Sequence, residues 1–142
     1  LAMGYPDKQQ GMAIVQEHKD HHPLEDIEPL VQAEEITRLQ ARVRATAVED
    51  SVVSYMTDIV RSTREDSRLQ LGASPRAALV LYRTSQALAM LYERDYVTPD
   101  DVKELALPVL AHRIVLQTKA QYSGVEKEAV INDVLERTPV PT

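Results

Sequence analysis

The stretch "LGASPRAALVLYRTSQALA", residues 71–89, decides the fold, because it joins a helix start to a long apolar run. Serine is a favoured N-cap residue and proline suits the first helical position, so Ser74 and Pro75 predict a helix from Pro75 to about Tyr92. Apolar residues occupy nearly every side of this predicted helix. Such a pattern indicates a core helix, or one that is shared with a second surface.

Arg76 follows in the first turn of this helix, where a cation is unfavourable. The positive end of the helix dipole and the unpaired N–H groups make this placement cost about 0.3–1 kcal/mol. An anion nearby would reverse the sign, because a helix N-terminus with a guanidinium group suits phosphate or carboxylate. Alternatively, Arg76 pairs with a carboxylate of its own chain or extends into solvent.

Composition favours one all-α domain, a small helical bundle. The 142 residues contain four glycines and no tryptophan or phenylalanine, with 44% hydrophobic and 27% charged residues. No stretch is long and apolar enough for a membrane span, and the net charge of -6, without a basic block, makes a nucleic-acid groove unfavourable. The absence of cysteine fits a reducing compartment, so we expect a cytoplasmic protein.

Helical spacing of apolar residues also predicts helices at residues 33–45 and 50–64. Another begins with Thr98 as its cap and Pro99 at the first position, followed by two aspartates that complement the helix dipole. Pro108 cannot donate a backbone hydrogen bond, so we expect a break or kink there, after which the helix resumes briefly through Val109, Leu110 and Arg113.

The two ends of the chain carry weaker signals. Pro6 and Asp7 open a predicted helix that runs to about His18, and residues 18–31 have the composition of a linker. Residues 114–116 are expected to be extended. A capping box of Ser123 with Glu126 is expected to begin the last helix.

Three histidines, His18, His21 and His22, lie close in sequence to Asp20 and Glu25. Zinc sites need ligands on a rigid frame with supporting partners, whereas this segment has the composition of an exposed linker. We therefore expect no metal site.

Other polar groups also receive structural interpretations. Residues 61–72, which contain three arginines, are expected to form a solvated polar loop or an inter-subunit contact. Adjacent carboxylates are expected to cap helices or face solvent, and no nucleophile motif or phosphate-binding glycine loop is present. These carboxylate pairs are Glu34/Glu35, Glu65/Asp66 and Asp100/Asp101.

Two stretches, "GYPDKQQ" at residues 4–10 and "QLGASPRAALVLYRTSQALAMLYERDYVTPDDVKELALPVLAHRIVL" at residues 70–116, resemble the C-terminal part of MoxR-type AAA+ ATPases. The resemblance implies that residues 1–19 form the end of a P-loop core, with a strand exit and a helix. Residues 20–32 would then be a linker and residues 33–142 a helical lid. The phosphate-binding motifs of the core would lie upstream.

The same resemblance implies roles for four residues. Arg76 would be sensor 2, the catalytic and nucleotide-binding arginine that meets the γ-phosphate. Ser74 would cap the helix, Pro75 would position it, and Tyr5 would lie near the base. ATP and Mg²⁺ would be cofactors of the full-length parent, whereas these 142 residues alone would be inactive and need no cofactor.

The implied partners are the chain's own upstream P-loop core and further copies in a hexameric ring. The family acts like a chaperone in client assembly, often with a von Willebrand factor A domain protein, and no nucleic-acid or membrane partner is expected. An alternative, suggested by the long apolar helix and the helix after it, is a non-enzymatic interaction module that resembles a histone-fold dimer.

Overall fold

A computed structural model describes residues 4–17 and 23–141. Internal contacts divide the chain into two units, Leu1–Ile36 and Thr37–Thr142. The elements, in chain order, are α1 (Lys8–Glu17), η1 (Pro23–Asp26), α2 (Ala33–Ala45), α3 (Asp50–Glu65), β1 (Leu69–Leu71), α4 (Pro75–Leu91), α5 (Pro99–Leu110), η2 (Ala111–Arg113), β2 (Val115–Leu116), α6 (Thr118–Tyr122) and α7 (Lys127–Arg137). Within the described residues, no helix has the length and apolar character that crossing a bilayer requires.

The N-terminal unit contains α1, whose start is explained by local chemistry. The Asp7 carboxylate accepts a hydrogen bond from the Gln10 backbone N–H at 2.8 Å, and the Gln10 side chain accepts one from the Asp7 N–H at 3.0 Å. This reciprocal capping confirms the predicted helix start at Asp7. No residue of α1 is buried, and residues 4–7 adopt no regular secondary structure.

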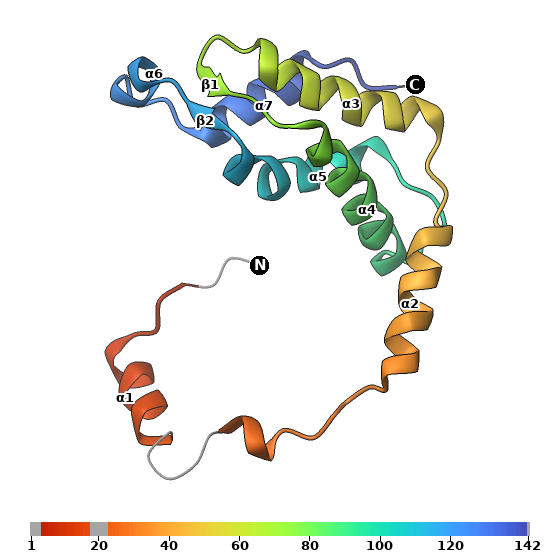
Figure 1. Ribbon diagram of the computed structural model, residues 1–142, viewed down its shortest axis with the longest axis vertical. Helices are drawn as coiled ribbons and strands as arrows, with labels where there is room; N and C mark the ends of the chain where they lie inside the picture. Colours follow the sequence, from red (N-terminus) through yellow and green to blue (C-terminus); the bar gives the residue numbers. More distant parts are fainter. Residues whose placement is uncertain (1–3, 18–22, 142) are drawn as a thin grey trace. The chain divides into compact units, whose positions relative to one another are not determined.

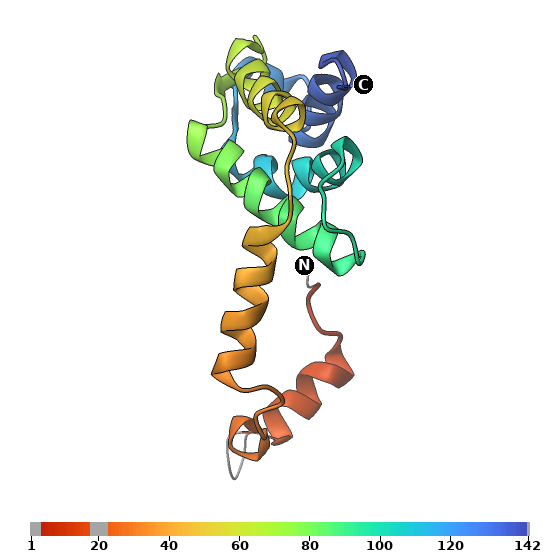
Figure 2. The same ribbon diagram turned by 90° about the vertical axis from the view of Figure 1, so that its right-hand side faces the viewer.

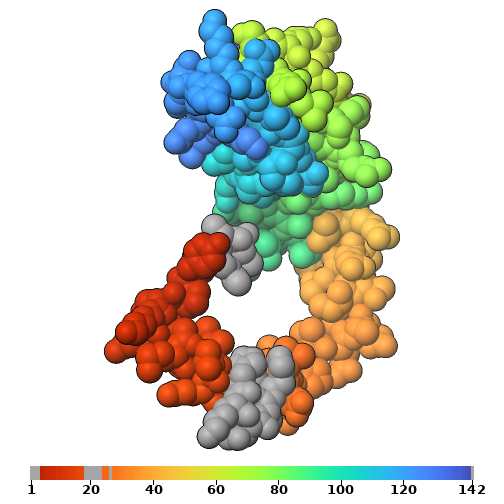
Figure 3. Space-filling view, turned by 60° about the vertical axis from the view of Figure 1, so that its left-hand side comes forward, coloured from red at the N-terminus to blue at the C-terminus, as the bar shows by residue number. Residues whose placement is uncertain are grey.

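The C-terminal unit is a helical bundle. In it α4 packs against α3 and α5, and α7 packs against the same two helices (Figures 1 and 2). Side chains from all four helices form one core. Its largest apolar members include Tyr55, Met56, Ile59, Leu81, Leu110 and Ile131. In the space-filling view the yellow-green, green and blue parts of the C-terminal unit form one continuous surface (Figure 3).

The bundle confirms the all-α prediction and the central position of α4. The helix begins at Pro75 and ends at Leu91, one residue before the predicted end. Leu79 and Leu91, on the same helix, are 68% and 72% exposed, and a second surface shared with this helix stays a prediction.

A two-stranded antiparallel ladder of β1 and β2 joins segments far apart in the chain. Leu69 pairs with Leu116 and Leu71 with Val115. The extended piece at 114–116 was predicted, but residues 61–72 were expected to be a polar loop. That expectation was wrong for residues 69–71, which form β1 because the fold supplies β2 as its partner, whereas the helical residues up to Glu65 agree with the helix predicted over 50–64.

Two predicted features of helix ends differ from the structure. No break occurs at Pro108, since α5 continues through it to Leu110 and then tightens into η2, which ends at Arg113, so the predicted helical course up to Arg113 is present. Ser123 does not cap the last helix. It lies at the end of α6, where its hydroxyl donates to the Lys119 carbonyl at 2.9 Å, and Glu126 is the N-cap of α7 without a side-chain capping bond.

Candidate functional site

The candidate site is the corner that leads into α4, and hydrogen bonds to both backbone groups of Ala73 hold it in place. The Ala73 backbone N–H donates to the Thr63 hydroxyl at 2.9 Å, and the Arg64 Nε donates to the Ala73 carbonyl at 2.8 Å. Thr63 in turn donates to the Val60 carbonyl at 2.7 Å. The last turn of α3 therefore fixes the chain immediately before Ser74.

Gly72 allows this close approach. A Cβ at this position would lie 2.6 Å from the Thr63 carbonyl oxygen and 2.7 Å from the Arg64 Cα and N atoms. Because these are backbone atoms, they cannot move aside as a flexible side chain would. The glycine lets the β1–α4 connection lie directly on the end of α3.

Ser74 and Pro75 occupy the predicted N-cap and first helical position of α4. Ser74 is therefore the N-cap residue, as predicted, but its side chain makes no capping hydrogen bond. The first turn also contains no acidic residue. The N–H groups at this helix end therefore lack the usual side-chain acceptors, and the site retains capacity for an anion.

Arg76 is exposed and, within the described part of the chain, makes no hydrogen bond or ion pair. Of the two alternatives, a carboxylate partner in the described part of the chain is absent, and the exposed side chain agrees with extension into solvent. A cation at the positive end of a 17-residue helix is placed unfavourably without a partner. The arrangement suits an anion supplied from outside these residues.

The other arginines near the corner have internal partners. Arg61 pairs with Glu65 along α3 at 2.9 Å, and Arg64 holds Ala73. Arg68 binds Asp66 and Asp133. Arg76 thus differs from its three neighbours in having no partner among the described residues.

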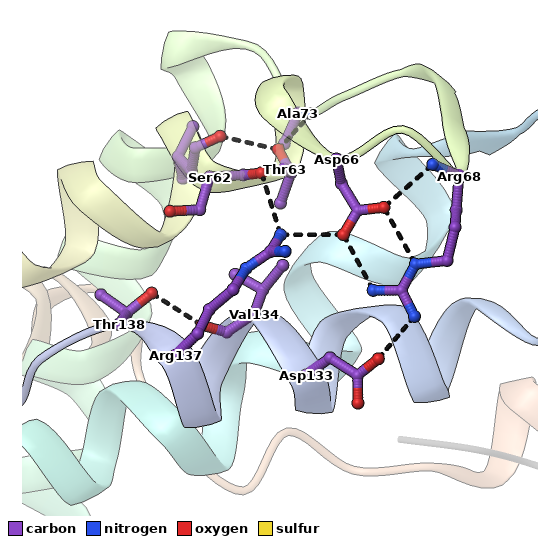
Figure 4. A network of polar contacts seen from close by, with 10 residues as sticks. Ser62, Thr63, Asp66, Arg68, Ala73, Asp133, Val134, Arg137 and Thr138 are labelled. Carbon is purple, nitrogen blue, oxygen red and sulfur yellow. Dashed lines mark hydrogen bonds and ion pairs between the residues drawn. The ribbon is translucent and has the colours of Figure 1, made fainter.

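Asp66 forms a buried ionic network that the sequence did not reveal (Figure 4). Its side chain, 3% exposed, accepts hydrogen bonds from the Arg68 guanidinium and backbone N–H and from the Arg137 Nη2 at 2.8 Å. The hydrogen bonds from Arg68 hold the pKa of Asp66 well below its usual range, against the opposing effect of burial. The expectation of a capping or solvated carboxylate was wrong here, because Asp66 fastens α7 to the end of α3.

A second pair, Arg94 with Asp101, organises the connection between α4 and α5. Asp101 binds the Arg94 guanidinium through both carboxylate oxygens and completes a capping box with Thr98. Burial raises the pKa of Asp101, but the hydrogen bonds from Arg94 and Thr98 outweigh it and lower the pKa. The predicted Thr98 cap is confirmed, and the Asp101 carboxylate stabilises the start of α5 and its contact with Arg94.

Two sequence predictions lie beyond what these contacts address. Tyr5 belongs to the N-terminal unit and is fully exposed, so its proximity to a base stays a prediction. His18, Asp20, His21 and His22 lie outside the described residues, within which no group of three possible metal ligands occurs.

Comparison with known proteins places this geometry in a family. Residues 61–134, which include the clamped corner and most of α7, match the model of the AAA lid domain. The chain is also similar to a Cytophaga hutchinsonii protein assigned as an ATPase, whose crystal structure aligns with a TM-score of 0.80 and 25% identity, over 99% of this chain and 45% of that one.

Two curated relatives indicate which kind of AAA protein contains a similar lid. An uncharacterised Bacillus subtilis protein, YeaC, is 36% identical over 99% of this chain and 44% of its own length. The chaperone MoxR1 of Mycobacterium tuberculosis is 31% identical over 99% of this chain and 39% of its own length. The chain therefore spans less than half of the relatives that it matches.

The fold and the corner define an AAA lid domain, and the chain belongs to that family. Its relatives identify it as the lid part of a MoxR-type AAA+ ATPase. This assignment favours the ATPase interpretation over the histone-like module.

Proposed function

We propose that this lid carries the sensor-2 arginine of a MoxR-type ATPase and that Arg76 binds the terminal phosphate of ATP held by a P-loop core. The observation that carries the proposal is the exposed guanidinium of Arg76, which lacks an internal partner among the described residues and lies in a first helical turn that has no side-chain cap and no acidic residue. A guanidinium fork and a helix N-terminus are both suited to phosphate oxygens.

In this proposal the lid stabilises the charge that develops during phosphoryl transfer. ATP with Mg²⁺ supplies the transferred phosphoryl group, whereas Arg76 contributes a fixed positive charge. Thr63, Arg64 and Gly72 hold the corner, so movement of the bundle carries Arg76 with it. The lid would thereby couple nucleotide state to the geometry of an oligomeric ring.

The biological setting is proposed from the relatives. A chaperone-like role in the assembly or maturation of client complexes is proposed because the relative MoxR1 is named a chaperone. The assignment of residues 1–19 to the end of the core, a cytoplasmic location and a von Willebrand factor A domain partner remain predictions.

The test is steady-state ATP turnover of a parent protein that contains this lid and its P-loop core. We expect Arg76→Ala to lower turnover by about 10- to 200-fold, the value of a charged contact of about 1.5–3 kcal/mol. Circular dichroism is expected to show no change in folding because Arg76 is exposed.

Arg38→Ala is the matched control, because Arg38 is an exposed arginine on α2, away from the corner in sequence. Its turnover should stay within twofold of the wild type. Equal turnover of Arg76→Ala and the wild type would remove Arg76 from the mechanism.

A further inference from the structure

A groove of about 510 Å³ lies between α3 and α4, within the C-terminal unit. Part of its lining belongs to the core, because Met56 and Val60 are each 1% exposed, whereas Leu79 is 68% exposed. The volume lies within the range of about 300–1,000 Å³ that is typical of small-molecule pockets, which are mostly apolar with a few polar groups. The other apolar residues of the lining are Val53, Pro75, Ala78 and Tyr82.

The two ends of the groove differ in polarity. Arg61 and Arg64 line it from the last two turns of α3. This end adjoins the corner before α4, because the Arg64 Nε donates to the Ala73 carbonyl at 2.8 Å. Val53, about 17 Å along α3 from Arg64 at 1.5 Å per residue, lies at the other end. The groove therefore has a cationic end at the corner and an apolar end away from it.

The cationic end has capacity for an anion. None of the lining residues, all of which the structure describes, is acidic. Arg61 pairs with Glu65, but their side chains are 72% and 63% exposed, and such i,i+4 pairs contribute little. The Nη atoms of Arg64 make no hydrogen bond or ion pair with any residue that the structure describes. Two guanidinium groups at one end of an apolar groove suit a single carboxylate.

We propose that the α3–α4 groove binds a small carboxylic acid that has an apolar body. The carboxylate pairs with Arg61 and Arg64. The apolar body lies against Met56, Val60 and Leu79, where removal of apolar surface from water stabilises the complex. A strongly hydrated polyanion such as free phosphate would lose its hydration against this lining without gaining a partner there, so the lining favours an amphipathic acid.

The groove shares Arg64 and Pro75 with the corner before α4, whereas Arg76 does not line it. A carboxylate on the Arg64 Nη atoms leaves the Nε atom bound to the Ala73 carbonyl, so the acid and the clamped corner are compatible. The groove thus lies beside the proposed phosphate site. Its occupation requires neither nucleotide nor a P-loop core.

The test titrates octanoate into the 142-residue chain labelled with nitrogen-15 and follows the backbone amides by NMR. We expect saturable shifts at residues 53–64 and 75–82, with a dissociation constant of about 1 mM or lower. The compound 1-octanol has the same chain without the charge, and acetate has the charge without the chain. Each should bind at least about tenfold more weakly, because each lacks one of the two interactions.

Two variants test the two ends of the groove. Leu79→Asp adds a negative charge to the lining and should weaken octanoate binding at least about tenfold. Leu91→Asp is its matched control, because Leu91 is similarly exposed on the same helix but does not line the groove, and it should change the affinity less than about twofold. Arg61→Gln should weaken octanoate binding by about fivefold or more and leave the shifts caused by 1-octanol unchanged. Arg38→Gln, an exposed arginine of α2, is the control for that loss of charge.

Absence of saturable shifts, or equal effects of Leu79→Asp and Leu91→Asp, would overturn the proposal. Equal affinity for octanoate and 1-octanol would refute an acid as the ligand. Arg76→Gln should bind octanoate within about twofold of the wild type, and a loss as large as that of Arg61→Gln would place the carboxylate at the start of α4 and refute a separate site. Since these titrations contain no nucleotide and no core, their failure is distinct from failure of the Arg76 turnover test.

Discussion

The buried Asp66 carboxylate offers the sharpest test of what holds the bundle together. Asp66→Asn preserves shape but removes the charge and replaces one acceptor oxygen with a donor that faces guanidinium groups. The carboxylate accepts contacts from Arg68 at 2.8, 2.9 and 3.0 Å and from Arg137 at 2.8 Å, and the amide cannot satisfy all of them.

The expected loss follows from these contacts. Each charge-assisted hydrogen bond contributes about 1.5–3 kcal/mol, and about two are lost. The side chains of Arg68 and Arg137 are 29% and 48% exposed, so solvent recovers part of the cost. We expect a decrease of about 2–3 kcal/mol in unfolding free energy, or roughly 8–12 °C in melting temperature for a domain of about 100 residues.

Urea unfolding followed by circular dichroism measures this difference. Asp133→Asn is the control, because Asp133 also pairs with Arg68 but is 52% exposed, and it should cost about 0.5 kcal/mol or less. An Asp66→Asn variant within 0.5 kcal/mol of the wild type would refute the reasoning.

The pH dependence provides an independent check on the same residue. Its pKa is lowered in the folded state by Arg68, so the unfolded chain takes up the proton first, near pH 4. The stabilisation from Asp66 is therefore complete above the unfolded pKa and is lost as the pH falls towards the folded pKa. The difference between wild type and Asp66→Asn should be constant from pH 5 to pH 8 and decrease below about pH 4.

Two further predictions concern the corner before α4. Gly72→Ala places a Cβ against backbone atoms of α3 and should lower the unfolding free energy of the bundle by about 1–3 kcal/mol in urea unfolding. Gly11→Ala, whose Cβ would have no atom within 4 Å, should cause no such loss. Equal stability of the two variants would contradict the close approach at Gly72. Thr63→Val leaves the Ala73 N–H without its acceptor and should cost about 1–3 kcal/mol in thermal melting, and Thr63→Ser should restore most of this loss. A serine variant as unstable as the valine variant would show that the hydroxyl does not hold the corner.

The sequence by itself determined the features that depend on neighbouring residues. The α5 start at Thr98–Pro99, the α4 start at Ser74–Pro75 and the opening of α1 at Asp7 were predicted because the residue types that favour a helix start lie next to one another in the sequence. Arg76 was found by the same local reasoning, since its place in a first turn is unfavourable without a partner.

The tertiary structure alone decided the features that need distant partners. β1 forms because β2 lies beside it, and Asp66 is buried because Arg137, 71 residues away, reaches its carboxylate. The capping box predicted at Ser123 is absent, because Ser123 lies at the end of α6 and its hydroxyl donates to the Lys119 carbonyl. Contacts between residues far apart in sequence appear only after the helices pack, so a local pattern could single out Arg76 but not the contacts of Thr63 and Arg64 with Ala73 that hold the corner before it.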